Sequence, residues 1–271
     1  MSMNRFIKTK RYKQFSEFCK ACHYDKIIGL CYGAAGVGKT ESARYYSKWY
    51  QLSQFIQRAP YASPAPKPKL TCSIKRLNSI VYTPSLLDPP KEIVTDIKNM
   101  QRRFSFLKEK DIYGEDIPWH ARQESRNFAE LVIIDEAERL KAQGFELIRE
   151  MYDEGKATFI FIGMPGIEKT LERFPQLYSR VGFLHQFKTL GKTEIEFIIE
   201  KHFMKLGIEM DENDFSDQET VSTIIRMTEG NFRLINRLLK QSLRIMKVNR
   251  MTTLTKEIIE AARSCLLIGE K

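Results

Sequence analysis

Short apolar runs alternate with segments of helical periodicity along the first part of the chain. Four apolar runs predict buried strands, at residues 27–32, 79–83, 131–134 and 157–162. Helical patterns lie around and between them, at residues 41–50, 90–108 and 119–130. Since strands that alternate with helices belong to α/β folds, we predict an α/β domain with a mainly parallel sheet.

From about Thr189 onward the pattern is helical throughout. Helices are predicted at residues 194–206, 217–228, 232–248 and 255–267, and no strand candidate stands out among them. We therefore predict an α/β domain over residues 1–188, followed by a small all-helical domain over residues 189–271. A proline-rich stretch at residues 58–69 cannot be helical and is predicted to be an extended connection within the first domain.

Composition is that of an ordinary soluble protein. Of the 271 residues, 42% are hydrophobic and 29% are charged, and no apolar run approaches the length of a membrane span. The first residues also lack the apolar segment of a signal peptide. We expect a cytoplasmic protein with no membrane partner.

Five cysteines in a reducing compartment predict no disulfide framework. Residues 19–23 match the C-x-x-C-H string of haem attachment, but that chemistry requires export, and no second cysteine pair completes a zinc site. The two cysteines share an amphipathic helical pattern with Tyr12, Phe15 and Phe18. Core or surface thiols are therefore the favoured interpretation.

The chain is basic, with a formal net charge of +10. Lys and Arg concentrate in residues 1–30, 51–110 and 226–263, whereas acidic residues gather around 111–154 and 194–219. This distribution favours nucleic acid or an acidic protein as a partner, although a merely solvated basic surface is the alternative.

A complete G-x-x-x-x-G-K-T phosphate-binding loop follows the first predicted strand and precedes a predicted helix. Its residues are Gly33, Ala34, Ala35, Gly36, Val37, Gly38, Lys39 and Thr40, with Glu41 opening the helix. Glycines let backbone N–H groups approach phosphate oxygens, Lys39 supplies charge to the β/γ-phosphates, and the Thr40 hydroxyl suits Mg²⁺. The helix N-terminus adds a positive dipole. We predict binding of ATP and Mg²⁺, against the alternative of a chance glycine-rich turn.

The predicted strand at residues 131–134 ends in Asp135-Glu136, which matches the Walker B pattern. A buried strand would deliver Asp135 to its carboxyl edge, where it can hold Mg²⁺. Glu136 would then orient or deprotonate the attacking water. Two arginines, Arg180 before the helical domain and Arg233 within it, could stabilise or sense the γ-phosphate, although a lone arginine is more often a solvated side chain.

Together these motifs resemble the AAA+ ATPases, and within that class the transposition regulators of the TniB/TnsC/MuB type. Three segments carry the resemblance: Gly33–Thr40, Val132–Leu140, and the run from Phe161 to Phe183 that contains Gly-Met-Pro-Gly and Tyr-Ser-Arg-Val-Gly-Phe. The resemblance extends roughly over residues 10–265 and is loose between 51 and 128.

The resemblance implies an ATP-dependent regulator of DNA transposition. Such proteins oligomerise on double-stranded target DNA as rings or helical filaments, recruit a transposase together with a target-selector or adaptor protein, and disassemble on ATP hydrolysis. By the same resemblance Glu136 is the catalytic base, Arg180 an arginine finger that acts in trans, and Arg233 a lid sensor. The DNA path implied by relatives matches a basic stretch here, with Lys98, Arg102 and Arg103 as candidate phosphate contacts.

One position departs from the AAA+ pattern. A polar sensor 1 residue usually follows the strand after Walker B, but Gly163-Met164 occupies that place here. We therefore expect ATP hydrolysis to be slow or partner-stimulated. Two alternatives remain: a helicase-loader or replication-initiation ATPase, and a small-molecule P-loop kinase, which would leave the basic stretches and the lid arginine unexplained.

Overall fold

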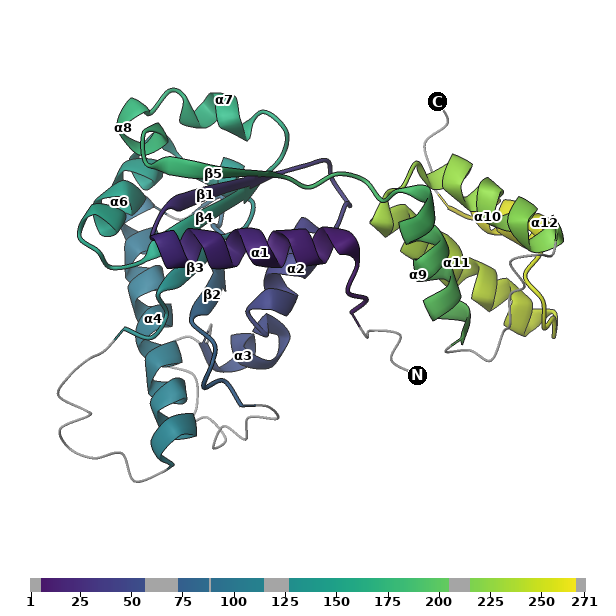
Figure 1. The fold of residues 1–271 in the computed structure, drawn as a ribbon, viewed down its shortest axis with the longest axis horizontal. Helices are drawn as coiled ribbons and strands as arrows, with labels where there is room; N and C mark the ends of the chain where they lie inside the picture. The colour runs from purple at the N-terminus through teal and green to yellow at the C-terminus, as the bar shows by residue number, and fades with distance from the viewer. Residues whose placement is uncertain (1–5, 57–72, 88, 115–126, 205–214, 267–271) are drawn as a thin grey trace. The chain divides into compact units, whose positions relative to one another are not determined.

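The computed structural model describes residues 6–56, 73–87, 89–114, 127–204 and 215–266. They form two compact units (Figure 1). One unit comprises residues 14–33 and 39–186, and the other comprises the described parts of residues 1–13, 34–38 and 187–271. The predicted proline-rich connection at 58–69 lies outside the described residues, as do residues 119–126 of a predicted helix.

A five-stranded parallel sheet forms the centre of the first unit, in the order β2-β3-β4-β1-β5 (Figure 1). Its strands are β1 (Ile28–Tyr32), β2 (Ser79–Tyr82), β3 (Leu131–Ile134), β4 (Thr158–Gly163) and β5 (Val181–Gln186). Every residue of β2, β3 and β4 is buried, as expected for a parallel sheet covered on both faces. The predicted α/β class and the four predicted strands are confirmed.

Helices surround this sheet. They are α1 (Lys10–Asp25), whose first turn belongs to the other unit, α2 (Lys39–Tyr46), α3 (Trp49–Ile56), α4 (Pro90–Tyr113), the 3₁₀ helix η1 (Ala137–Arg139), α6 (Ala142–Asp153), α7 (Ile167–Leu171) and α8 (Pro175–Tyr178). Helix α4 was predicted from the sequence, whereas α6, α7 and α8 were not.

Helices α1 and α6 cover opposite faces of the sheet. On one face a Cβ at Gly29 would lie 2.5 Å from Cys22 Sγ of α1 and 3.2 Å from Ile160 of β4, so α1 packs closely on β1. On the other face Phe161 packs against Phe145 of α6, with ring centroids 5.7 Å apart. Successive residues of a strand point to opposite faces of the sheet. Since Ile160 lies on the side of α1 and Phe161 contacts α6, the two helices lie in different layers.

Strand β5 was not predicted from the sequence. It lies at the edge of the sheet beside β1 and alternates between half-buried and exposed residues. Phe18 of α1 stacks on His185, with ring centroids 5.2 Å apart, whereas Leu184 is 61% exposed. The strand therefore lacks the continuous apolar run that identified its neighbours.

Two helix predictions were wrong in part. The single helix expected over residues 41–50 is two helices, α2 and α3, because Lys48 adopts a left-handed conformation with φ of 47°. The fully buried Ser47 hydroxyl is 2.9 Å from the Ser79 hydroxyl of β2, which fixes the break. Residues 127–130, predicted to end another helix, are not helical.

The second unit is mainly helical. It contains α9 (Lys192–Met204), α10 (Phe215–Thr228), α11 (Phe232–Val248) and α12 (Lys256–Ser264), which matches the four predicted helices within a few residues. Its core includes Ile199, Ile224, Leu238, Leu239 and Ile259. Among the described helices of either unit, none has both the length and the apolar character needed to cross a membrane.

Candidate functional site

The loop between β1 and α2 has the conformation that its glycines predict. It runs from Gly33 to Thr40 at the carboxyl end of β1, and α2 begins at Lys39. Gly36 and Gly38 have φ angles of 81° and 108°, a left-handed region that favours glycine. Turns of this kind direct successive N–H groups into a concave surface suited to anions.

Lys39 is held against this loop and the end of β4. It is 9% exposed, its Nζ donates to the carbonyl of Gly33, and the same atom lies 3.9 Å from Met164 Sδ. Burying an ammonium group without a compensating charge costs free energy. A triphosphate bound at this loop would supply that charge and form charge-assisted hydrogen bonds with Lys39.

Asp135 and Thr40 meet at the carboxyl edge of the sheet. Asp135 follows β3 and is 2% exposed, and its carboxylate accepts a hydrogen bond from the Thr40 hydroxyl. Burial raises the pKa of Asp135, while the Thr40 hydrogen bond and the nearby charge of Arg44 act in the opposite direction. The two predicted Mg²⁺ ligands are therefore in direct contact.

Glu136 is held in an unusual backbone conformation. Its φ and ψ are 55° and 47°, and such left-handed non-glycine residues cost about 1–3 kcal/mol and cluster at functional sites. The carboxylate forms an ion pair with Arg139, which also donates to the carbonyl of Pro84 at 3.3 Å. The predicted catalytic base is thus half-exposed and tied to a neighbour that the sequence analysis did not identify.

The sensor 1 position at Gly163 is closely surrounded by two side chains. A Cβ at Gly163 would lie 2.5 Å from Ile167 Cδ1 and 2.9 Å from Glu138 Oε2. A larger residue would therefore require the side chains of Ile167 and Glu138 to shift. The neighbouring Met164 places its sulfur near Lys39 instead of a hydrogen-bonding group.

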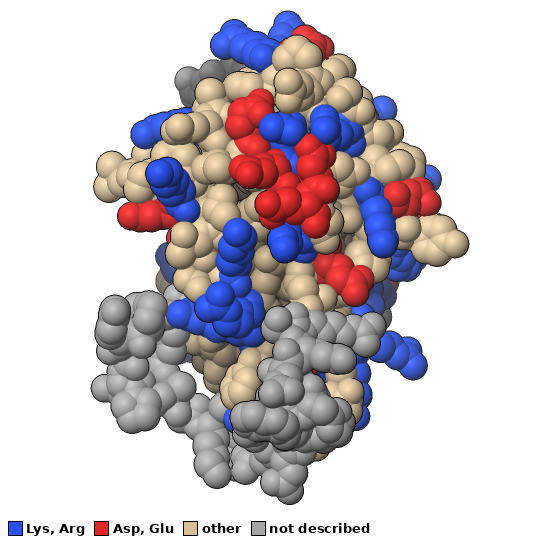
Figure 2. Space-filling view, turned by 90° about the vertical axis from the view of Figure 1, so that its left-hand side faces the viewer, with Lys and Arg blue, Asp and Glu red and all other residues tan. Residues whose placement is uncertain are grey.

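Arg180 lies between α8 and β5 and is bound by an acid of α6. Its Nε and Nη2 lie 2.5 Å and 2.8 Å from the two carboxylate oxygens of Asp153, which also pairs with Arg149 at 2.8 Å. Arg180 is the main reason that the pKa of Asp153 is lowered. Figure 2 looks onto the side where α6 lies, and acidic and basic side chains are interspersed there. The predicted finger is therefore engaged by a residue of its own chain.

In the helical unit, the start of α11 is bonded to loop residues 34–38. Asn231 caps α11 by accepting from the N–H of Arg233 at 3.1 Å, and its amide donates to the carbonyl of Ala35 at 2.9 Å. The Arg233 N–H also lies 3.0 Å from the carbonyl of Gly36. The Arg233 side chain is exposed. The predicted lid arginine therefore follows directly on a helix cap that contacts the loop.

Comparison with known proteins identifies the family. A family model described as an AAA domain matches residues 22–171, which include both the phosphate loop and the Asp135-Glu136 pair. The chain belongs to the AAA family. A Staphylococcus aureus protein described as "Potential ATP-binding protein" is 42% identical over 269 residues, which cover 97% of each chain. We therefore describe the chain as an ATP-binding AAA protein.

Solved structures share the fold of this AAA protein. The Thermotoga maritima RuvB Holliday junction branch migration motor matches with a TM-score of 0.60 at 17% identity, over 96% of this chain and 69% of RuvB. The Aeropyrum pernix ORC2 protein matches with a TM-score of 0.56 at 14% identity, over 97% of this chain and 69% of ORC2. The predicted AAA+ core with a helical C-terminal part is thereby confirmed as a fold.

The candidate DNA contacts on α4 of the AAA protein differ from one another. Lys98 and Arg102 are exposed, and Arg102 has a 3.4 Å contact with Asn99. Arg103 is half-buried and donates to the carbonyl of Ile56 at 2.9 Å, at the end of α3. Arg103 therefore has a structural contact, whereas the other two side chains face solvent.

The cysteines of the haem-like string lie in the core, as favoured from the sequence. Cys19 and Cys22 are fully buried in α1. Burial is the main reason that the pKa of Cys22 is raised to about 12, so this thiol stays protonated at neutral pH.

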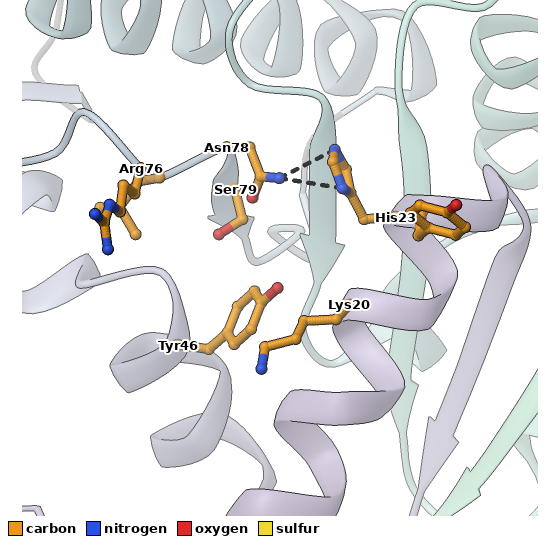
Figure 3. Close-up of a pocket in the computed structure, with 8 residues that line it drawn as sticks. Lys20, His23, Tyr46, Arg76, Asn78 and Ser79 are labelled. Atoms are coloured by element: carbon orange, nitrogen blue, oxygen red, sulfur yellow. Dashed lines mark hydrogen bonds between the residues drawn. The ribbon is translucent and has the colours of Figure 1, made fainter.

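A pocket of about 410 Å³ lies at the amino end of β2 (Figure 3). Its lining includes Lys20, His23, Tyr46, Arg76, Asn78 and Ser79. His23 is held by Asn78, 3.2 Å from Nδ1, and by Glu130, 2.7 Å from Nε2; the tautomer with a proton on Nε2 satisfies both contacts. Because the phosphate loop lies at the carboxyl end of β1 in the same parallel sheet, this pocket is separate from it.

The buried Asp135 leads to a prediction with two opposed effects. Asp135→Asn keeps an acceptor for the Thr40 hydroxyl but removes a buried charge, so we expect Mg²⁺-dependent ATP binding to weaken at least tenfold (about 1.4 kcal/mol). The ligand-free variant should nevertheless unfold at a higher temperature than the wild type at pH 7. Titration calorimetry and thermal unfolding measure the two effects.

The pH dependence of this stability gain follows from the raised pKa of Asp135. The ionised carboxylate destabilises the folded state at pH values above its folded pKa, and this cost is absent below the ordinary value of 3.8. The gain in the variant should therefore grow as the pH rises above 3.8 and vanish below it. Asp153→Asn is the matched control with the opposite sign, because the pKa of Asp153 is lowered. A lower unfolding temperature for both variants at pH 7 would contradict this account.

Proposed function

We propose that this AAA protein is an ATP-dependent, DNA-binding regulator of DNA transposition. It assembles on double-stranded target DNA, recruits a transposase with a target-selector or adaptor protein, and leaves the DNA after hydrolysis. The observation that carries the proposal is the segment from Gly163 to Phe183, whose sequence resembles this class of regulators. In the fold it links the nucleotide loop, through Met164, to Arg180 at the start of the edge strand.

The residues at the carboxyl edge of the sheet fit a magnesium triphosphate. Thr40 and Asp135 offer one hydroxyl and one buried carboxylate in contact with each other. Within the part of the chain that the structure describes, no group of three or more His, Cys, Asp or Glu side chains forms a metal cluster. Mg²⁺ is commonly held by one or two carboxylates plus phosphate oxygens and water, and it would neutralise charge on the phosphates.

Glu136 would accept a proton from the attacking water or orient that water. The ion pair with Arg139 engages one oxygen of this carboxylate, Oε2, and so competes with that role. With no polar side chain at Gly163, the described residues add no sensor 1 group to help position the water. Both features favour slow hydrolysis by the isolated protein and stimulation by a partner that repositions Glu136.

Arg180 would act on the nucleotide of a neighbouring subunit. For this its guanidinium must exchange Asp153 for the γ-phosphate, so the pairing with Asp153 competes with assembly. Partly exposed ion pairs of this kind are weak, and a desolvated phosphate can displace them. Assembly would thereby be linked to the presence of ATP.

Duplex DNA is a polyanion that complements the net charge of +10. Lys98 and Arg102 face solvent on α4 and are suited to phosphate contacts without sequence reading. The structural contact of Arg103 with Ile56 makes it the weakest of the three candidates.

A replication-type ATPase, such as a helicase loader, is the second candidate. The fold likeness to ORC2 and the basic character favour it as much as they favour a transposition regulator. Partner choice separates the two: co-purification of a tagged protein in the presence of ATP and DNA should yield a transposase, whereas recovery of a replicative helicase would favour the alternative. DNA-independent phosphorylation of a metabolite would favour a kinase.

ATP turnover provides the quantitative test of the proposal. We expect slow release of phosphate from the protein alone and a stimulation of at least about tenfold when duplex DNA and the transposase are both present, because each contact helps to assemble the inter-subunit site. A coupled phosphate assay measures it, and Lys39→Ala serves as the inactive control. Rapid turnover by the protein alone, unchanged by DNA, would contradict the proposed switch.

A further inference from the structure

Helix α11 carries a line of cations along one side. Arg237, Lys240, Arg244 and Lys247 are all exposed and are spaced by three, four and three residues. At 3.6 residues per turn this spacing confines them to about 80° of the helix circumference and to a length of about 15 Å. We call these four residues the α11 basic stripe.

The opposite side of α11 forms the core of the helical unit. Ile235, Leu238, Leu239 and Met246 are buried there with residues of α9, α10 and α12. The helix is therefore oriented by its apolar side, and the basic stripe is left to solvent without a part in packing.

The stripe is not neutralised by nearby acids. Among the described residues, no carboxylate forms an ion pair with any of its four members. Four acids of this unit pair with cations outside the stripe, among them Glu219 with Lys256 at 2.7 Å and Glu194 with Arg11 at 3.3 Å. Since like charges three and four residues apart on a helix repel, the stripe lowers the stability of α11 in isolation.

We propose that the α11 basic stripe binds the phosphate backbone of duplex DNA, as a contact separate from α4. This inference rests on the proposed DNA-binding function. Neighbouring members of the stripe lie about 5–6 Å apart, and a duplex presents one negative charge per about 1.7 Å of its axis, so each cation can reach a phosphate. Long Lys and Arg side chains adapt to the backbone without reading bases.

The surroundings of the stripe favour DNA over an acidic protein. Protein interfaces have a core of apolar and aromatic side chains, in which charged residues are depleted. On α11 the large apolar side chain that is well exposed is Val248, at the last position of the helix. A surface with four cations and little exposed apolar area matches a polyanion.

The test compares two triple variants with the same loss of charge. Lys240→Gln with Arg244→Gln and Lys247→Gln removes three members of the stripe. The control Lys192→Gln with Arg226→Gln and Arg263→Gln removes three exposed cations from α9, α10 and α12. Binding to a 30-base-pair duplex of mixed sequence is followed by fluorescence anisotropy over a range of salt concentrations, with a non-hydrolysable ATP analogue and Mg²⁺.

We expect the stripe variant to bind DNA at least about tenfold more weakly, with a log K versus log salt slope shallower by about 2.7 for three lost phosphate contacts. The control should stay within about twofold of the wild type. The charge-preserving variant Lys240→Arg with Arg244→Lys and Lys247→Arg should bind as the wild type does. In the wild type, DNA should also protect Lys240 and Lys247 from acetylation more than Lys192, a measurement that needs no variant.

Three results would overturn the inference. If the stripe variant keeps the wild-type affinity and salt slope, the stripe does not contact DNA, and the proposed DNA-binding function is unaffected. Intact DNA binding together with lost transposase binding makes the stripe a protein interface. If the wild-type protein binds no duplex DNA, both this inference and the proposed DNA-binding function are wrong. The first and third results therefore distinguish failure of the inference from failure of the proposed function.

Discussion

Replacing Arg180 by Ala should lower ATP turnover by the DNA-assembled protein by about 10³-fold or more, the usual effect of removing an arginine finger. ATP binding by the isolated subunit should change little, because within its own subunit Arg180 pairs with Asp153 rather than with the phosphate loop. Single-turnover hydrolysis and nucleotide binding measure the two effects. Arg173→Ala, which removes an exposed arginine of the same segment, is the control.

Mixing variants shows whether Arg180 acts across the subunit interface. Arg180→Ala retains its own phosphate loop, and Lys39→Ala retains its own arginine, so each is inactive alone. In an equal mixture about a quarter of head-to-tail interfaces combine an intact loop with an intact arginine. Turnover should therefore recover to a comparable fraction of the wild type. If mixed assemblies of normal size form but ATP turnover does not recover, Arg180 acts on the nucleotide of its own subunit.

Replacing Glu136 by Gln should lower hydrolysis by about 10²–10⁴-fold while ATP binding is retained, since general-base catalysis contributes that much. The exchange removes the group that accepts a proton but leaves Thr40, Lys39 and Asp135 unchanged. DNA-bound assemblies of this variant should persist with ATP, as wild-type assemblies do with a non-hydrolysable analogue.

The control for this variant is Glu150→Gln, at an exposed position of α6. It should hydrolyse ATP at the wild-type rate. Wild-type turnover by the Glu136 variant would show that this carboxylate is not the base, and the ion pair with Arg139 would then be a structural contact only.

The sequence predicted the parts of the fold that follow from continuous burial. Strands β1, β3 and β4 are apolar runs because both of their faces are covered, and α11 was delimited by its strongly amphipathic pattern. Strand β5 could not be found in this way because Gly182 and Leu184 face solvent at the sheet edge. The break after α2 depends on a buried contact between Ser47 and Ser79, which no local pattern contains.

The candidate site, like the fold, could be predicted from the sequence only in part. A parallel sheet brings the ends of β1 and β3 to one edge, so the contact of Thr40 with Asp135 follows from two motifs and the topology. The partners of Glu136 and Arg180 do not follow from motifs. Arg139 could have been noticed because it lies three residues after Glu136, but Asp153 is distant in sequence from Arg180 and meets it only through the packing of α6.

We propose that ATP binding assembles this protein on duplex DNA. Electron microscopy of the purified protein with duplex DNA, Mg²⁺ and a non-hydrolysable ATP analogue tests it most directly, with the same sample lacking nucleotide as the control. We expect rings or helical filaments around the DNA that are absent without nucleotide. Monomers that stay dispersed under both conditions would contradict it.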